Sequence, residues 1–301
     1  MKPGRAVRTA VIPAGGLGTR FLPFTRSVPK ELLPIVDTPV LEHVVSECAR
    51  SGIERVVLIV APGKESLAAY FQPSPRIEAR LRAEHRDLEL AALKRPETLA
   101  RIEVVVQQEP KGNGHAVLIA RDAVGDEPFA MLWGDDIVLG RTPALRQMLD
   151  ARDRLGGSVA GAARINPAEA SRYGIFRGRP EADETGKGGA FRVTGMVEKP
   201  ASGTAPSDLA AVHGYVLEPG IFGILETIRP GRGGEIWLVD AIDALAAREP
   251  VWAVELEGDR YDAGDRAGYV AAFVDQALAR DDVGPALRDH LRRQGWHPPE
   301  P

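Results

Sequence analysis

Four continuous apolar segments are the feature of this 301-residue sequence that most restricts its fold. We expect strands at Val7–Pro13, Glu54–Ala61, Arg101–Gln108 and Pro128–Asp136. Strands that are apolar throughout, rather than alternating, are buried on both faces and are typical of parallel sheets. Helical patterns separate these strands, as in residues 39–52. The first 140 residues or so therefore predict a doubly wound α/β sheet with helices on both faces.

The pattern changes after Gly156, where shorter and more alternating apolar segments are separated by loops rich in glycine and proline. We interpret these segments as a mixed extension of the same sheet rather than as an independent domain. Arg76–Arg95 is a charged, amphipathic insertion between the second and third strands. It predicts either a solvated helix or an arm used in self-association.

Composition and charge argue against two classes of partner. The formal net charge of −4 does not favour nucleic acid, which requires a basic surface. No stretch reaches the roughly 18 apolar residues of a membrane-spanning helix. The apolar run that ends at Pro13 is too short for a signal peptide. We therefore expect a cytoplasmic protein that binds neither nucleic acid nor membrane.

A glycine-rich turn, "AGGLG" at Ala14–Gly18, directly follows the first predicted strand. Backbone N–H groups in such a turn can surround an anion, and Arg20 adds a fork of donors for phosphate oxygens. The dinucleotide-binding pattern fails because Phe21 occupies the third glycine position. The P-loop pattern also fails, since Glu65 follows Lys64 where serine or threonine is required. From the turn alone, a ligand site and a simple strand-to-loop connection both remain open.

Acidic residues near the ends of later strands predict a metal site in a cleft. Asp135 and Asp136 end the fourth predicted strand, and Asp262 lies in "YDAGD" between a strand and a helix. In an open α/β sheet, ligands bind beyond the carboxyl ends of the strands. Mg²⁺ typically takes one or two carboxylates together with substrate phosphates. The cations expected near this rim are Arg20, Lys30 and Lys199.

Several segments together resemble the sugar-nucleotide pyrophosphorylases, and in particular the bacterial UTP–glucose-1-phosphate uridylyltransferases. They are "GGLGTRFLPFTRSVPKELLPIVDTP", "GHAVLIA", "VGDEPFAML", "VTGMVEKP", "GGEIWLVDAID" and "AGDRAGYVAAFV". The resemblance implies a Rossmann-like nucleotidyltransferase fold, with a doubly wound, mixed and mostly parallel sheet. It also implies one domain over residues 1–301, with a nucleotide-binding half at about 7–140, a sugar-phosphate-binding half at about 141–280 and a C-terminal helical tail at 281–301.

The same resemblance assigns roles on the nucleotide side. The family's glycine turn contacts the nucleobase and phosphates, and here it comprises Ala14, Gly15, Gly16 and Gly18. The arginine and lysine that hold the triphosphate match Arg20 and Lys30. The glutamine that contacts the pyrimidine edge, five residues before a helix-opening glycine, matches Gln107 before Gly112.

The sugar and metal residues follow in the same way. Glu198 is implied to bind the sugar hydroxyls, Lys199 the sugar phosphate, and Gly174 to lie against the sugar. Asp135 is implied to bind Mg²⁺ with Asp262 as its partner, whereas Asp136 is expected to support or cap. His115, inside the same motif, is a further candidate for ligand contact, and Glu235 and Asp240 are candidates for residues that shape the sugar site.

The resemblance implies transfer of a uridylyl group from UTP to glucose 1-phosphate, giving UDP-glucose and pyrophosphate. It also implies a homo-oligomer, either a dimer or a tetramer. A thymidylyltransferase, or a uridylyltransferase acting on another sugar 1-phosphate, remains an alternative. A non-catalytic regulatory protein that binds sugar nucleotides is an alternative of another class, and the failed fingerprint disfavours a Rossmann dehydrogenase.

Some residues depart from the family pattern. The chain has Asn113 where the family usually has leucine, and Gly134 where proline usually precedes the first metal aspartate. It has His213-Gly214-Tyr215 in place of Gly-Arg-Tyr. Trp237 and Val239 replace the usual glutamine and threonine. These positions fall near the predicted nucleotide loop and sugar site, so they bear on the preference for uridine and glucose.

Overall fold

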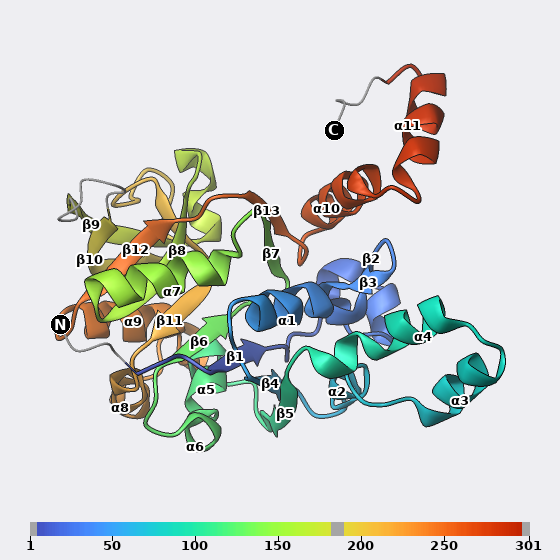
Figure 1. Ribbon diagram of the computed structural model, residues 1–301. Helices are drawn as coiled ribbons and strands as arrows, with labels where there is room; N and C mark the ends of the chain where they lie inside the picture. Colours follow the sequence, from blue (N-terminus) through green and yellow to red (C-terminus); the bar gives the residue numbers. More distant parts are fainter. Residues whose placement is uncertain (1–4, 182–189, 297–301) are drawn as a thin grey trace.

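The computed structural model describes residues 5–181 and 190–296, and one nine-stranded mixed sheet organises this part of the chain (Figure 1). In spatial order its strands are β5 (Arg101–Val106), β4 (Arg55–Val60), β1 (Thr9–Pro13), β6 (Phe129–Leu132), β11 (Leu209–Leu217), β8 (Ser158–Arg164), β12 (Val251–Glu255), β10 (Ala190–Glu198) and β9 (Gly174–Glu181). The predicted mixed α/β sheet is confirmed, and the segments after Gly156 extend it.

Parallel and antiparallel pairings occupy different parts of this sheet. β5, β4, β1 and β6 are parallel neighbours. β11 pairs antiparallel with β6 and β8, and β10 pairs antiparallel with β12 and β9. In the later half, β8 and β12 form the parallel pair. The description "mostly parallel" therefore fits the first half of the chain and not the second.

Helices cover both faces of the sheet, which is why its central strands are apolar throughout. In β1, Val11 belongs to one apolar core, whereas Ala10 and Ile12 belong to the other. The first core contains side chains from α5 (Asn113–Leu118), α8 (Gly220–Thr227) and α9 (Leu238–Ala246). The second contains side chains from α1 (Val40–Arg50) and α7 (Ala144–Leu155). Successive strand residues point to opposite faces, so each face must be apolar.

The fourth predicted strand is shorter than expected. β6 ends at Leu132, and the chain turns before β7 (Asp136–Leu139). The N–H of Trp133 still bonds to the carbonyl of His213 at 3.0 Å, but beyond it the chain leaves the large sheet. β7 instead pairs antiparallel with β13 (Asp259–Asp262), which places Asp136 opposite Asp262. This separate ribbon brings the predicted metal residues together.

The remaining elements lie around this frame. The insertion forms α3 (Pro75–Ala83) and α4 (Asp87–Lys94), and α10 (Arg266–Ala279) and α11 (Gly284–Arg293) extend away from the sheet (Figure 1). The shorter elements are β2 (Pro34–Ile35), β3 (Thr38–Pro39), α2 (Ser66–Ala69) and α6 (Arg121–Val124). In residues 5–181 and 190–296, none of the helices combines the length and apolar character needed to span a bilayer.

Candidate active site

A cavity of about 660 Å³ lies beyond the carboxyl ends of β1, β5 and β6 and is lined from both halves of the chain. The predicted residues that line it are Gly15, Gly16, Arg20, Lys30, Gln107, Gly112, Asp135, Gly174, Glu198, Lys199 and Asp262. Ala14 and Gly18 lie beside it rather than in its lining. Ala14 is buried and donates its N–H to the Ile59 carbonyl at 2.7 Å. Gly18 has a φ of 64°, a conformation that favours glycine.

Gln107 is held in one orientation at the edge of the cavity. Its Nε2 donates to the carbonyl of Gly112 at 3.2 Å and lies 2.9 Å from Nδ1 of His115. Its Oε1 lies on the side of Gly15, 3.8 Å from the position of a Cβ on that glycine. The side-chain oxygen Oε1 of Gln107 is thus available to accept a hydrogen bond from a ring N–H. In this arrangement His115 contacts Gln107 and helps to fix it.

The glycine loop before α5 is docked onto the opposite half of the chain. Gly112 has a φ of 95°, and a Cβ there would lie 2.5 Å from the carbonyl oxygen of Ile236. Oδ1 of Asn113 accepts the N–H of Leu238, the first residue of α9, at 2.8 Å. This bond gives a helix-terminal N–H a partner. Asn113, one of the departures from the family pattern, therefore ties the two halves together.

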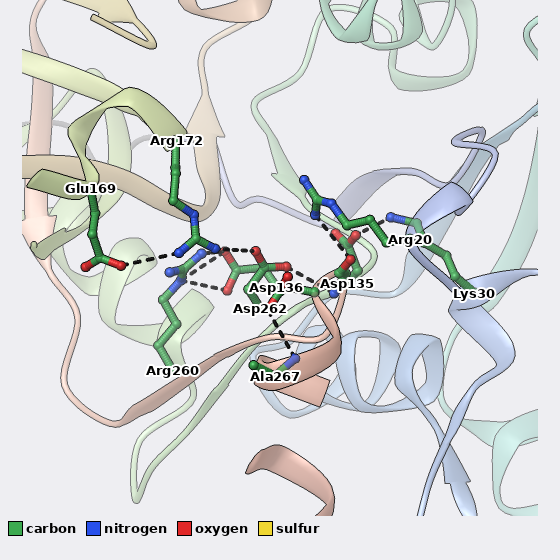
Figure 2. A network of polar contacts seen from close by, with 11 residues as sticks. Arg20, Lys30, Asp135, Asp136, Glu169, Arg172, Arg260, Asp262 and Ala267 are labelled. Atoms are coloured by element: carbon green, nitrogen blue, oxygen red, sulfur yellow. Dashed lines mark hydrogen bonds and ion pairs between the residues drawn. The ribbon is translucent and has the colours of Figure 1, made fainter. Parts of the chain in front are cut away.

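Asp135 and Asp262 approach one another beside Gly264 (Figure 2). A Cβ placed on Gly264 would lie 2.3 Å from Oδ2 of Asp135 and 3.1 Å from Oδ1 of Asp262. Burial raises the pKa of Asp262, and the neighbouring carboxylates of Asp135 and Asp136 raise it further. Two crowded carboxylates of this kind favour a cation between them.

Basic side chains already surround these carboxylates. Lys30 forms an ion pair with Asp135, and Nη1 of Arg20 donates to the Gly264 carbonyl at 3.1 Å. Nη2 of Arg172 lies 4.0 Å from Oδ2 of Asp262. Figure 2 shows these side chains converging on the same group of carboxylates. The rim can therefore hold a cation and phosphate oxygens next to each other.

Asp136 also lines the cavity, but its carboxylate is hydrogen-bonded to other residues of the protein. Both of its oxygens accept hydrogen bonds from Arg260, the shortest at 2.7 Å, and Oδ2 also accepts the N–H of His213 at 3.0 Å. His213 is fully buried, and its Nε2 lies 2.9 Å from Oε1 of Glu47. Asp136 thus has the supporting position that was expected.

The side of the cavity that carries Lys199 is built around Tyr173. Arg172 and Arg260 both stack on its ring, at 5.7 and 5.4 Å from the centroid. The carbonyl of Tyr173 accepts the N–H of Lys199 at 3.0 Å. None of these contacts was predicted, because Arg172 and Arg260 were not recognised; their positions directly before "YG" and "YD" were the available signal.

The predicted sugar-binding residues lie next to one another on this wall. Nζ of Lys199 is 3.0 Å from Oε1 of Glu198 and 5.2 Å from the centroid of Trp237. A Cβ on Gly174 would lie 3.1 Å from Cγ2 of Val239 and 3.4 Å from Oε2 of Glu198, so a side chain there would press against Val239 and touch the carboxylate. Glu235 lines the cavity, whereas Asp240 does not.

Comparison with known proteins identifies close similarity along nearly the whole chain. The nucleotidyl transferase family model matches residues 9–278. The UTP–glucose-1-phosphate uridylyltransferase YngB of Bacillus subtilis is 43% identical over 287 residues, covering 95% of each chain. A second enzyme of that name, from Staphylococcus saprophyticus, is 41% identical over 290 residues, covering 96% of this chain and 98% of its own.

Solved structures give the same result. The UTP-bound UGPase from Acinetobacter baumannii superposes with a TM-score of 0.86 at 32% identity, covering 95% of this chain and 99% of its own. A UDP-glucose pyrophosphorylase complexed with UDP-glucose gives a TM-score of 0.80 at 34% identity, covering 91% of this chain and 100% of its own. These similarities confirm the resemblance found in the sequence.

Proposed function

The chain belongs to the nucleotidyl transferase family, and from that premise we propose that it transfers a uridylyl group from UTP to α-D-glucose 1-phosphate. The products are UDP-glucose and pyrophosphate. The observation that carries the proposal for this chain is one cavity that joins Arg20 and Lys30 of the first half to Lys199 of the second, around Asp135 and Asp262. Such a cleft is suited to two polyanions that repel each other.

We assign the nucleotide to the wall formed by the glycine turn. The N–H groups of Gly15 and Gly16 would contact the nucleotide, and Arg20 and Lys30 would bind the triphosphate. Gln107 supports a pyrimidine beside the glycine turn. Its Oε1 can accept a hydrogen bond from the ring N–H that uracil and thymine carry. Cytosine lacks that N–H, so this contact favours uracil over cytosine.

We assign the sugar phosphate to the opposite wall. Glu198 would accept hydrogen bonds from sugar hydroxyls, and Lys199 would bind the phosphate. Gly174 would leave room for the sugar ring beside Glu198. The close approach of Lys199 to Glu198 supports this assignment, since groups that bind a sugar hydroxyl and the adjoining phosphate must lie side by side.

Asp135 and Asp262 would hold a divalent metal, which enzymes of this family generally use, and we propose Mg²⁺. The fit rests on two carboxylate oxygens that converge on one side of Gly264 and on the raised pKa of Asp262. When bound, Mg²⁺ supplies positive charge for phosphate oxygens. Lys30, which pairs with Asp135 in the structure, would then become available to the triphosphate.

The reaction needs no nucleophile from the protein. The second pKa of a phosphate monoester is about 6, so the sugar phosphate is largely ionised at neutral pH. Its oxygen attacks the α-phosphorus in line, and the bond from that phosphorus to the bridging oxygen breaks. The electron pair leaves with pyrophosphate. The cationic side chains position the two substrates and offset their repulsion.

A pyrophosphate-release screen tests the proposal. UTP, dTTP, CTP and ATP are each combined with several sugar 1-phosphates and Mg²⁺. We expect the highest kcat/KM for UTP with glucose 1-phosphate. A higher value for dTTP or for another sugar would replace the proposed substrates, and no release with any pair would favour a binding protein without catalytic activity.

We further propose that the protein is a homo-oligomer, either a dimer or a tetramer. The insertion that carries α3 and α4 projects from the body (Figure 1), and it exposes Ile77 and Leu88 by 50% and 85%. Such side chains favour association when they join into one contiguous patch. Light scattering of the purified chain gives its mass in solution, and a monomeric mass at micromolar concentration would contradict the proposal.

A further inference from the structure

Lys64 is a largely buried cation that stands behind the glycine turn and does not line the cavity. Its ammonium group donates to the carbonyl of Ala14 at 3.3 Å, to the carbonyl of Gly16 at 2.5 Å and to Oε2 of Glu31 at 3.3 Å. An ammonium group has three N–H donors, and these three acceptors use all of them. The sequence drew attention to Lys64 only as the point where the P-loop pattern fails.

These contacts fix the orientation of two peptide groups in the turn. In a trans peptide, the C=O of one residue and the N–H of the next point in opposite directions. Carbonyls of Ala14 and Gly16 that point toward Lys64 therefore direct the N–H groups of Gly15 and Leu17 away from it. Gly15 and Gly16 line the cavity, whereas Lys64 does not.

Glu31 holds Lys64 in this position. Its side chain is 1% exposed, and its Oε1 is buried without a hydrogen-bond partner among the described residues. Burial raises the pKa of Glu31, whereas Lys64 and Lys30 oppose that effect. A buried carboxylate of this kind strongly favours a nearby cation. Lys64 is therefore bound to the protein, whereas the neighbouring Lys30 faces the cavity.

We propose that Lys64 is a positioning residue for the nucleotide, because it holds the carbonyls of the glycine turn inward so that the N–H groups face the ligand. The inference rests on the proposed placement of UTP at this turn. Pre-oriented donors bind an anion more tightly, since they need no reorganisation when it arrives. Lys64 thus acts through the backbone and has no contact with substrate.

The test compares Lys64→Met with the double variant Lys64→Met/Glu31→Gln. The single variant leaves Glu31 charged without its nearest partner, so we expect lower stability as well as weaker binding of UTP. The double variant removes that buried charge but still leaves both turn carbonyls without the ammonium group. We expect its melting temperature to recover toward that of the wild type while its UTP affinity stays low. Lys94→Met, on α4, is the matched control.

Binding of UTP is measured by calorimetry, and KM for UTP and for glucose 1-phosphate are measured separately. We expect both Lys64 variants to weaken UTP binding about tenfold, the effect of losing one or two pre-oriented hydrogen bonds. The KM for glucose 1-phosphate should change by less than about twofold, since Lys64 does not line the sugar wall. A double variant that binds UTP as the wild type does would overturn the inference, because Lys64 would then contribute only to stability. A wild-type chain that binds no UTP would overturn the proposed function as well.

Discussion

The two walls of the cleft hold their functional groups in different ways. On the wall that we assign to the nucleotide (the nucleotide wall), the side chain of Lys30 is 19% exposed and paired with Asp135, and Gln107 is bonded to the Gly112 carbonyl. On the wall that we assign to the sugar phosphate (the sugar wall), the side chains of Lys199 and Arg172 are 51% and 49% exposed. Buried partners restrict a side chain more than solvent does. Lys30 and Gln107 therefore have less freedom to move than Lys199 and Arg172, which could reorient toward a phosphate.

The backbone conformations of the two walls also differ. On the nucleotide wall the positive φ at Gly112 falls on glycine, where a Cβ would collide with Ile236. On the sugar wall it falls on Lys199, with a φ of 44°. A non-glycine residue in this region costs on the order of 1 kcal/mol and persists only when its surroundings hold it there. The N–H of Lys199, bonded to Tyr173, contributes that restraint.

The largest effect is expected from Lys199→Ala on the sugar wall. The substitution removes the cation assigned to the attacking phosphate, where charge changes most during the reaction. We expect kcat to fall about 100- to 1,000-fold, as when one preorganised group is lost from a charged transition state. Steady-state pyrophosphate release measures the loss. Because Lys199 is half exposed, the melting temperature should not change.

Lys94→Ala is the control for removal of a lysine outside the cleft. If Lys199→Ala kept kcat within threefold of the wild type, the attacking phosphate would have to bind elsewhere. The greater freedom of Lys199 compared with Lys30 would then have no functional consequence.

A smaller effect is expected from a substitution at His213, which does not line the cavity. Like Gln107 on the nucleotide wall, His213 is held by hydrogen bonds within the protein. Burial alone would lower the pKa of His213, but Glu47 and Asp136 outweigh it and raise the pKa above 6.5. The folded state therefore binds the proton more tightly than the unfolded state. This stabilisation is fully present below pH 6.5 and is lost as the pH rises through the folded-state pKa.

His213→Asn tests this linkage, because asparagine tolerates the φ of 65° at this position. We expect the free energy of unfolding to fall by about 2 kcal/mol at pH 6, the value of a buried hydrogen bond to a charged group. The difference from the wild type should shrink by pH 9. Denaturant titrations at several pH values measure it, with the exposed His290→Asn as control. A difference that grew with pH would show that His213 is neutral in the folded protein.

The sequence predicted the parts of this site that depend on residues close to one another along the chain. Continuous apolar runs predicted the parallel strands, and the position of Asp135 at the end of such a run predicted its place on the rim. The resemblance supplied Gln107, Glu198 and Lys199, and all three line the cavity. Their binding roles remain predictions.

The contacts that the sequence did not predict join residues far apart in the chain. Asp136 meets Arg260 across 124 positions, and His213 meets Glu47 across 166. Such pairs depend on strand register and on the path of β7 out of the large sheet, and neither is encoded in a local pattern. Lys64 was noticed only for failing a motif, because its partners are two backbone carbonyls and a buried carboxylate.

The smallest effect is expected from Trp237→Gln, which restores the residue usual in the family. Nζ of Lys199 lies 5.2 Å from the centroid of the Trp237 ring, and at exposed sites such a contact contributes about 0.5–1 kcal/mol. We expect the KM for glucose 1-phosphate to rise about two- to fivefold, with kcat and the KM for UTP unchanged. Trp237→Phe keeps an aromatic face and should recover most of the loss, whereas Trp296→Gln controls for removal of an exposed indole. A rise in the KM for UTP instead would mean that Trp237 acts through its neighbour Ile236 on the glycine loop, and the two walls would then be coupled to each other.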